Sequence, residues 1–178
     1  MKRLLFLLLV AITPSVLAQN IPCMKIDYTD GQKIMQSISE NVMVGVIVED
    51  EAEFEKNFQF WISVKPLLND VVFGTNNIKV EYKDKEGVFF SCDVYTKKEW
   101  ENKNAKKINR QTLWFGGYDD SLADEIAYAD KYYLQKSTIS PDEKTELKYV
   151  VAKNPKAIEM YVIITIGNDV FEFDLSEE

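Results

Sequence analysis

The clearest pattern along the chain is the alternation of apolar and polar residues in two regions. Residues 78–82 alternate apolar and charged side chains, which predicts a strand with one buried face. A turn at 84–87 and a second alternating run at 88–95 predict an antiparallel partner for it. Near the end of the chain, an apolar run at 158–166 and an alternating run at 170–175 predict a second hairpin.

Other segments repeat apolar residues at helical spacing. The strongest runs over 121–133, and another begins at Thr96, where Glu99 completes a capping box. Residues 111–115 are expected to form a strand after that helix. Further short strands are expected at 24–28 and 42–48, and further helices at 34–38, 50–65 and 141–153.

The helix expected at 141–153 has a competing interpretation. Pro141 follows Ser140 as in the first turn of a helix, yet Val150 and Val151 are β-branched, so a strand over 147–152 is the alternative. Helices and strands interleave early, and hairpins dominate later. The pattern therefore predicts one α+β domain over 19–178, with a mixed, mostly antiparallel sheet of five to six strands packed with four to five helices.

The first 18 residues have the layout of a secretory signal peptide. Lys2 and Arg3 precede an apolar run at 4–12, and Ala18 ends the segment with a small residue. The run is too short to span a bilayer, which needs about 20 apolar residues. We therefore expect cleavage after Ala18 and a periplasmic or secreted protein without a membrane span.

Composition narrows the choice of partners. The chain has 21 basic and 29 acidic residues, a net charge of −8, and loss of Lys2 and Arg3 would make it −10. Negative charge disfavours nucleic acid as a partner and is compatible with a basic protein partner. The exception is the segment 97–110, in which six basic residues meet two acidic ones. It is interpreted as a solvated helix face, with contact to an anionic envelope polymer as the alternative.

The two cysteines, Cys23 and Cys92, are expected to form one disulfide, because export places them in an oxidising compartment. Two independent thiols are the alternative. Pro22 precedes Cys23 where a lipoprotein would have a small residue, so lipidation is not expected.

The absence of histidine is the strongest constraint on mechanism. It excludes Ser–His and Cys–His nucleophiles and histidine zinc sites. Phosphate-binding and dinucleotide fingerprints are also absent, so no cofactor, metal or catalytic residue is assigned.

Acidic and aromatic residues gather at one place, which is the candidate binding site. It comprises Trp114, Phe115, Tyr118, Asp119 and Asp120. The simpler interpretation is that Asp119 and Asp120 sit just before a helix, where the helix dipole favours negative charge, and that Asp124 completes the cap. With Asp124 and Glu125, the same acids could instead serve a carboxylate-based glycan hydrolase.

We therefore expect an exported, non-enzymatic binding or inhibitory protein, for instance an immunity-type protein that blocks a basic partner. The alternatives are a cell-envelope glycan hydrolase and a small-molecule or lipid carrier. The carrier would use a cavity behind Phe54, Phe58 and Trp61, which fall on one face of the helix expected at 50–65.

Overall fold

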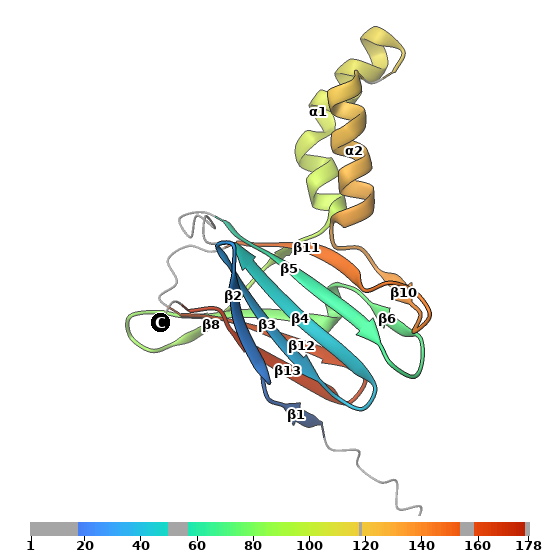
Figure 1. Cartoon of the computed structure of the whole chain (residues 1–178). Helices are drawn as coiled ribbons and strands as arrows, with labels where there is room; N and C mark the ends of the chain where they lie inside the picture. The colour runs from blue at the N-terminus through green and yellow to red at the C-terminus, as the bar shows by residue number, and fades with distance from the viewer. Residues whose placement is uncertain (1–17, 50–56, 118, 154–158, 177–178) are drawn as a thin grey trace, which may run out of the picture.

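The computed structural model of the chain describes residues 18–49, 57–117, 119–153 and 159–176. Two large β-sheets pack face to face, and a pair of helices projects from one end (Figure 1). The predicted signal peptide, apart from Ala18, lies outside the described residues. The first strand begins at Gln19, directly after the predicted cleavage point.

The first sheet has five strands. Its only parallel pair joins β1 to β13, and every other neighbouring pair is antiparallel. In spatial order the strands are β1 (Gln19–Ile21), β13 (Asp169–Asp174), β12 (Glu159–Ile166), β7 (Ile78–Lys83) and β8 (Phe89–Cys92).

The second sheet has six antiparallel strands. In spatial order they are β2 (Lys25–Thr29), β3 (Gln32–Ile38), β4 (Val42–Glu49), β5 (Asn57–Pro66), β11 (Glu146–Lys153) and β9 (Val94–Tyr95). A separate two-stranded sheet pairs β6 (Val71–Phe73) with β10 (Ser137–Ile139), and one 3-10 turn, η1, covers Thr75–Asn77.

One apolar core lies between the two large sheets. The central strands contribute every second side chain, as the two-residue period of a strand requires. On β5, for example, Phe58, Phe60, Ile62 and Val64 are all fully or almost fully buried. The same holds for Phe171 and Phe173 of β13, Val162 and Ile164 of β12, and Val44 and Val46 of β4.

The two helices form a hairpin, α1 (Lys97–Phe115) and α2 (Asp120–Tyr132), which run side by side away from the sheets (Figure 1). The predicted capping box is confirmed: Thr96 Oγ1 accepts from Glu99 N at 3.3 Å, and Glu99 Oε2 accepts from Thr96 N at 2.7 Å. Gly116 ends α1 with φ +66, a left-handed conformation that favours glycine.

The predicted α+β class is wrong. The described residues contain two α-helices and thirteen strands, so the protein is mostly β, with several sheets rather than one sheet covered by four to five helices. Three of the expected helices, at 34–38, 50–65 and 141–153, contain strands where the structure describes them. Residues 34–38 belong to β3, which pairs with β2 through a tight turn in which Asp30 and Gly31 have φ +51 and +76.

The helix expected at 50–65 is also wrong where the structure describes it. Residues 57–66 form β5, and Phe54 lies outside the described residues. Phe58 and Trp61 share a helical spacing, but in the strand Phe58 points into the core while Trp61 points to the opposite face. The cavity proposed for a carrier, which needed both side chains on one side, is therefore not formed by them.

Two further assignments change near the helices. Residues 111–115 continue α1 instead of forming a strand. Residues 146–153 form β11, so the strand alternative over 147–152 is confirmed and the helix is wrong. The hairpins β7–β8 and β12–β13, the strands β2 and β4, and the helix α2 are confirmed. Residues 94–95, expected to continue the return strand of the first hairpin, instead form β9 and pair with β11 in the other sheet.

The expected disulfide is absent, because Cys23 and Cys92 are both unpaired. Cys23 follows β1 and Cys92 ends β8, and these strands form opposite edges of the five-stranded sheet. Burial, together with the charge of Asp93, raises the pKa of the Cys92 thiol to about 11.

We expect the unfolded protein to take up two alkyl groups without prior reduction, one for each free thiol. In the folded protein at neutral pH, Cys92 should react slowly, because its raised pKa leaves little thiolate. Intact-mass measurement after iodoacetamide treatment reads both results. Alkylation only after reduction would show that the two cysteines form a disulfide after all.

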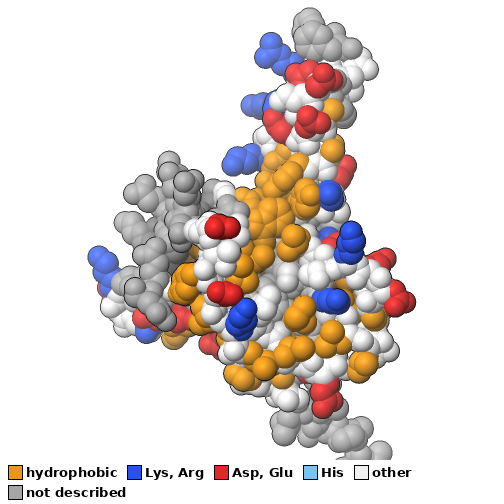
Figure 2. Space-filling view, viewed as in Figure 1, with side chains coloured by type: hydrophobic (Ala, Val, Ile, Leu, Met, Phe, Trp, Pro, Cys, Tyr) orange, Lys and Arg blue, Asp and Glu red, His pale blue; other side chains and the backbone are white. Residues whose placement is uncertain are grey.

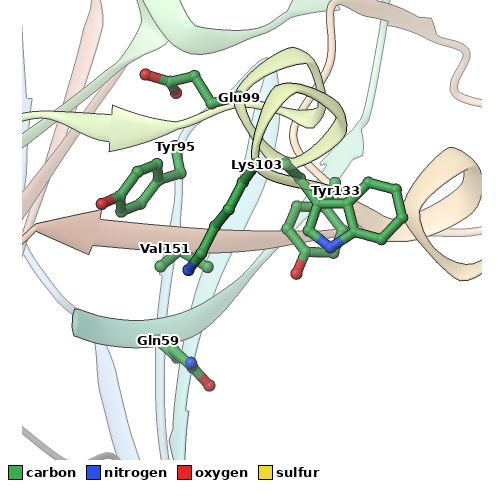
Figure 3. A pocket seen from close by; sticks show the side chains of 7 residues that line it. Gln59, Tyr95, Glu99, Lys103, Tyr133 and Val151 are labelled. Atoms are coloured by element: carbon green, nitrogen blue, oxygen red, sulfur yellow. The ribbon is translucent and has the colours of Figure 1, made fainter. Parts of the chain in front are cut away.

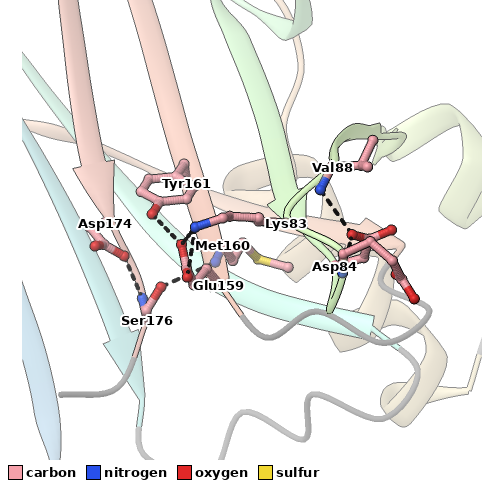
Figure 4. Close-up of polar contacts among 9 residues, drawn as sticks. Lys83, Asp84, Val88, Glu159, Met160, Tyr161, Asp174 and Ser176 are labelled. Atoms are coloured by element: carbon pink, nitrogen blue, oxygen red, sulfur yellow. Dashed lines mark hydrogen bonds and ion pairs between the residues drawn. The ribbon is translucent and has the colours of Figure 1, made fainter.

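A polar cluster joins β7 to β12 at the end of the five-stranded sheet (Figure 4). Lys83 Nζ lies 3.0 and 3.1 Å from the two carboxylate oxygens of Glu159, and Tyr161 OH donates to Glu159 Oε2 at 2.7 Å. The Tyr161 hydrogen bond and Lys83 lower the pKa of Glu159. The same hydrogen bond raises the pKa of Tyr161 to about 12.

This cluster predicts a late tyrosine titration. Because the pKa of Tyr161 is raised in the folded protein, the stabilisation from its contact is complete below pH 10 and is lost as the pH rises towards about 12. Glu159→Gln should return the pKa of Tyr161 towards 10, as read from tyrosinate absorbance. Tyr161→Phe should remove the late step of the tyrosinate titration and so assign that step to Tyr161. A titration curve that is the same in Glu159→Gln as in the wild type would contradict the role of Glu159.

Candidate functional site

The helical hairpin meets the sandwich through a cluster of aromatic rings on the outer face of the six-stranded sheet. Trp61 of β5 lies edge-on to Tyr132 of α2, with 5.6 Å between ring centroids, and contacts Tyr149 of β11 at 5.0 Å. Tyr128 contacts Tyr132 at 4.8 Å, and Tyr133 contacts Tyr149 at 5.3 Å. The cluster forms part of the apolar area where the hairpin joins the sheets (Figure 2).

The strand register explains why these rings meet. Trp61 pairs with Ile47 on one side and with Tyr149 on the other, so all three side chains point outwards in one row. Tyr133, which ends α2, forms a bridge to Tyr149 and places the helix base over this row. The outer face is therefore apolar where the hairpin covers it.

A cavity of about 120 Å³ opens beside this cluster (Figure 3). Its walls come from five separate parts of the chain: β5, β9, α1, the end of α2 and β11. The lining combines aromatic and polar side chains and comprises Gln59, Tyr95, Glu99, Trp100, Lys103, Tyr133 and Val151. An engineered cavity of roughly 150 Å³ binds benzene, so this volume suits a single ring-sized group.

The polar groups in the cavity differ in whether they already have partners. Glu99 accepts from the Thr96 backbone, and Gln59 Oε1 accepts from Tyr149 OH, which leaves the Gln59 amide hydrogens for a ligand. Burial raises the pKa of Tyr133, so its hydroxyl stays protonated.

Lys103 is the exception among them. Its side chain reaches between Tyr95 and Tyr133 towards Val151 (Figure 3). In the described part of the chain it has no ion pair or hydrogen bond. The cavity thus combines aromatic side chains with an ammonium group that has no partner among the described residues. Lys153 lies nearby, with its Nζ 4.9 Å from the centroid of the Tyr95 ring.

The residues that the sequence pointed to lie at the opposite end of the hairpin. Trp114 and Phe115 are in the last turn of α1, and Tyr118 lies outside the described residues. Asp119 and Asp120 begin α2. The structure therefore gathers the described candidates at the hairpin tip, away from the cavity.

Asp119 has a structural role. Its Oδ1 accepts from Leu122 N at 2.8 Å and caps α2. Its Oδ2 accepts from Gln111 Nε2, and its own N–H donates to Gln111 Oε1 at 2.8 Å. These bonds connect the two helices and make Asp119 the N-cap residue of α2, whereas Asp124, the residue expected to complete the cap, lies inside the helix. Asp120, exposed in the first turn, is placed where a helix dipole favours negative charge.

The other acids proposed for glycan hydrolysis lie along α2. Glu125 is paired with Lys107 of α1 at 2.7 and 2.9 Å. Asp124 and Glu125 line a hollow with Trp100, Tyr128 and Tyr133 on the α2 side of the hairpin. No group of acids and cysteines placed to hold a metal ion occurs among the described residues.

Sequence reasoning missed the cavity residues as a group. Tyr95 ends the strand expected at 88–95, and Trp100 lies in the segment 97–110, which is interpreted as a solvated helix face. The sequence did contain a signal for this site: aromatic residues are dense at 128–133 and recur at Tyr149. Both segments have other apolar residues that can fill the protein core, so these aromatic residues are not needed there. Such a surplus indicates a second, outward apolar contact.

Comparisons with known proteins add no assignment: no protein family, curated protein or solved structure matches this chain. Within the described ranges, no helix combines the length and apolar character needed to cross a membrane.

Proposed function

We propose that this is an exported, non-enzymatic binding protein that holds a ring-shaped ligand group in the cavity at the base of its helical hairpin. The observation that carries the proposal is the cavity itself, which is lined by Tyr95, Trp100, Tyr133 and Lys103, whose ammonium has no partner in the described part of the chain. Pockets that bind small ligands are typically apolar and aromatic with a few polar groups that fix orientation.

The side chains that line the cavity support binding rather than catalysis. The carboxylate nearest to it, Glu99, caps α1 and is committed to the Thr96 backbone. The lining contains no pair of free acids for acid–base chemistry. The basic protein partner expected from the acidic loop stays a prediction, and it is weakened because Asp119 is used within the hairpin.

Native mass spectrometry tests the proposal. The mature protein, expected to begin at Gln19, is incubated with a low-molecular-weight extract of the cell envelope. A bound species should appear with the wild type and fall about tenfold or more in Trp100→Ala, because an aromatic side chain contributes about 1.5–3 kcal/mol when a partner covers it.

Two further variants test whether the bound species occupies this cavity. Val151→Phe fills the cavity from its floor and should also remove the bound species, while Leu113→Ala, an exposed position on the same helix, should not. A wild-type protein that stays empty, or a bound species unaffected by Trp100→Ala and Val151→Phe, would reject this function.

A further inference from the structure

One face of α1 carries three basic side chains that lead to the cavity. Lys103, Lys106 and Arg110 are spaced i, i+3 and i+7, so they lie above one another on the same side of the helix. All three are exposed. They rise by about 1.5 Å per residue, so the row spans about 10 Å. Basic side chains are visible along the α1 side of the hairpin (Figure 2).

Within the ranges that the structure describes, no acidic side chain neutralises this row. Two other lysines of α1 have acidic partners: Lys97 lies 3.1 Å from Glu101, and Lys107 lies 2.7 Å from Glu125. By contrast, Lys103, Lys106 and Arg110 make no ion pair or hydrogen bond with the described residues. Three adjacent, unpaired cations are unusual on a chain whose net charge is −8.

The row is continuous with the cavity. Lys106 and Arg110 line a hollow of about 330 Å³ with Lys107 and Gln111, and Lys103, one turn lower, lines the cavity. A ligand seated in the cavity could therefore extend along α1, past one cation in each turn.

We propose that the ligand is an acidic oligosaccharide, with one sugar ring in the cavity and the carboxylates of the following sugars on Lys106 and Arg110. This inference rests on the proposed function, because it uses the same cavity. The flat aromatic walls suit the apolar face of a pyranose ring, and the Gln59 amide and Lys103 ammonium supply donors for its oxygens.

Charge complementarity favours an acidic oligosaccharide over a neutral one as the ligand. The negative charge over most of the chain repels an anionic ligand, so the cationic row is the place where it can bind. Arg110 can hold a carboxylate through two parallel hydrogen bonds, which a neutral sugar cannot use in the same way.

Isothermal titration with defined probes tests the inference. The probes are tetrasaccharides of galacturonate, hyaluronan and alginate, each compared with its carboxyl methyl ester, and hexaglutamate as an acidic peptide. At low salt we expect at least one acidic tetrasaccharide to bind, with its ester about tenfold weaker. Lys106→Gln and Arg110→Gln should each weaken binding about two- to fivefold, in the range of exposed ion pairs, and Trp100→Ala should abolish it.

Lys98→Gln is the matched control, since Lys98 is an exposed lysine of α1 on another side of the helix and should not affect binding. If an ester binds as tightly as its acid and still needs Trp100, the cavity binds sugars but the acidic class is wrong. Equal binding of hexaglutamate, or binding of no acidic tetrasaccharide while native mass spectrometry detects a bound species, also overturns the inference.

Discussion

Glu146→Ala should lower the free energy of unfolding by about 3 kcal/mol, because it leaves a buried lysine without its partner. The side chain of Lys148 is only 2% exposed, and it points into the core from β11, where it pairs in register with Ile62. Its ammonium is paired with Glu146, whose other carboxylate oxygen accepts from Ser137 Oγ at 3.1 Å. Removing the acid leaves a cation in an apolar environment.

Substitution of the lysine of this pair should have a different effect on stability. Lys148→Met keeps the volume and removes the buried charge, so its stability should be equal to or above that of the wild type. The double variant, Glu146→Ala with Lys148→Met, should recover most of the loss. Urea unfolding followed by circular dichroism measures all three variants. Glu40→Ala removes an exposed acid and is the control; a loss in Glu146→Ala no larger than in this control would contradict the buried pair.

The elements that the sequence predicted correctly have local causes. The hairpins β7–β8 and β12–β13 follow from alternating or continuous apolar runs on either side of turn residues, and α1 begins where Thr96 and Glu99 form a capping box. These signals depend on residues within a few positions of one another, so they can be read before the tertiary structure is known.

The failure at 57–66 has a physical reason. In β5 the inward side chains Phe58 and Phe60 alternate as a strand requires, but the outward Trp61 is also apolar. Two apolar faces remove the contrast on which alternation depends, and Phe58, Trp61 and Ile62 then fit a helical spacing as well. The outward apolar residue exists because the hairpin, far along the chain, covers it.

The candidate site could not be predicted for the same reason. Gln59, Tyr95, Lys103 and Val151 come from four elements, and their meeting depends on β5, β11 and β9 being neighbours in one sheet. The acidic group at the hairpin tip was visible because it is contiguous in sequence, and its main described acid, Asp119, caps a helix. Residues that are neighbours in the sequence thus revealed a helix cap, whereas the cavity residues come together only through the order of the strands in the sheet.

Trp61→Ala should release the helical hairpin from the sheet while leaving the sandwich folded. The ring of Trp61 contacts Tyr128, Tyr132 and Tyr149, so it joins α2 to the outer face of the six-stranded sheet. Isolated helices of this length are marginal in water and depend on tertiary packing. Loss of a packed Trp costs about 3 kcal/mol or more, and here the loss falls on the hairpin contact.

Hydrogen exchange measured by mass spectrometry separates the two parts of the molecule. In Trp61→Ala, amides of α1 and α2 should exchange faster by a factor of about 100, which corresponds to about 3 kcal/mol, while those of the central strands β4 and β12 should stay protected. Trp61→Phe keeps an aromatic ring and should lose less protection, and Leu113→Ala, at a site that is 81% exposed, should lose none. Uniformly faster exchange in helices and strands would mean that Trp61 stabilises the whole fold and that the hairpin is not a separable unit.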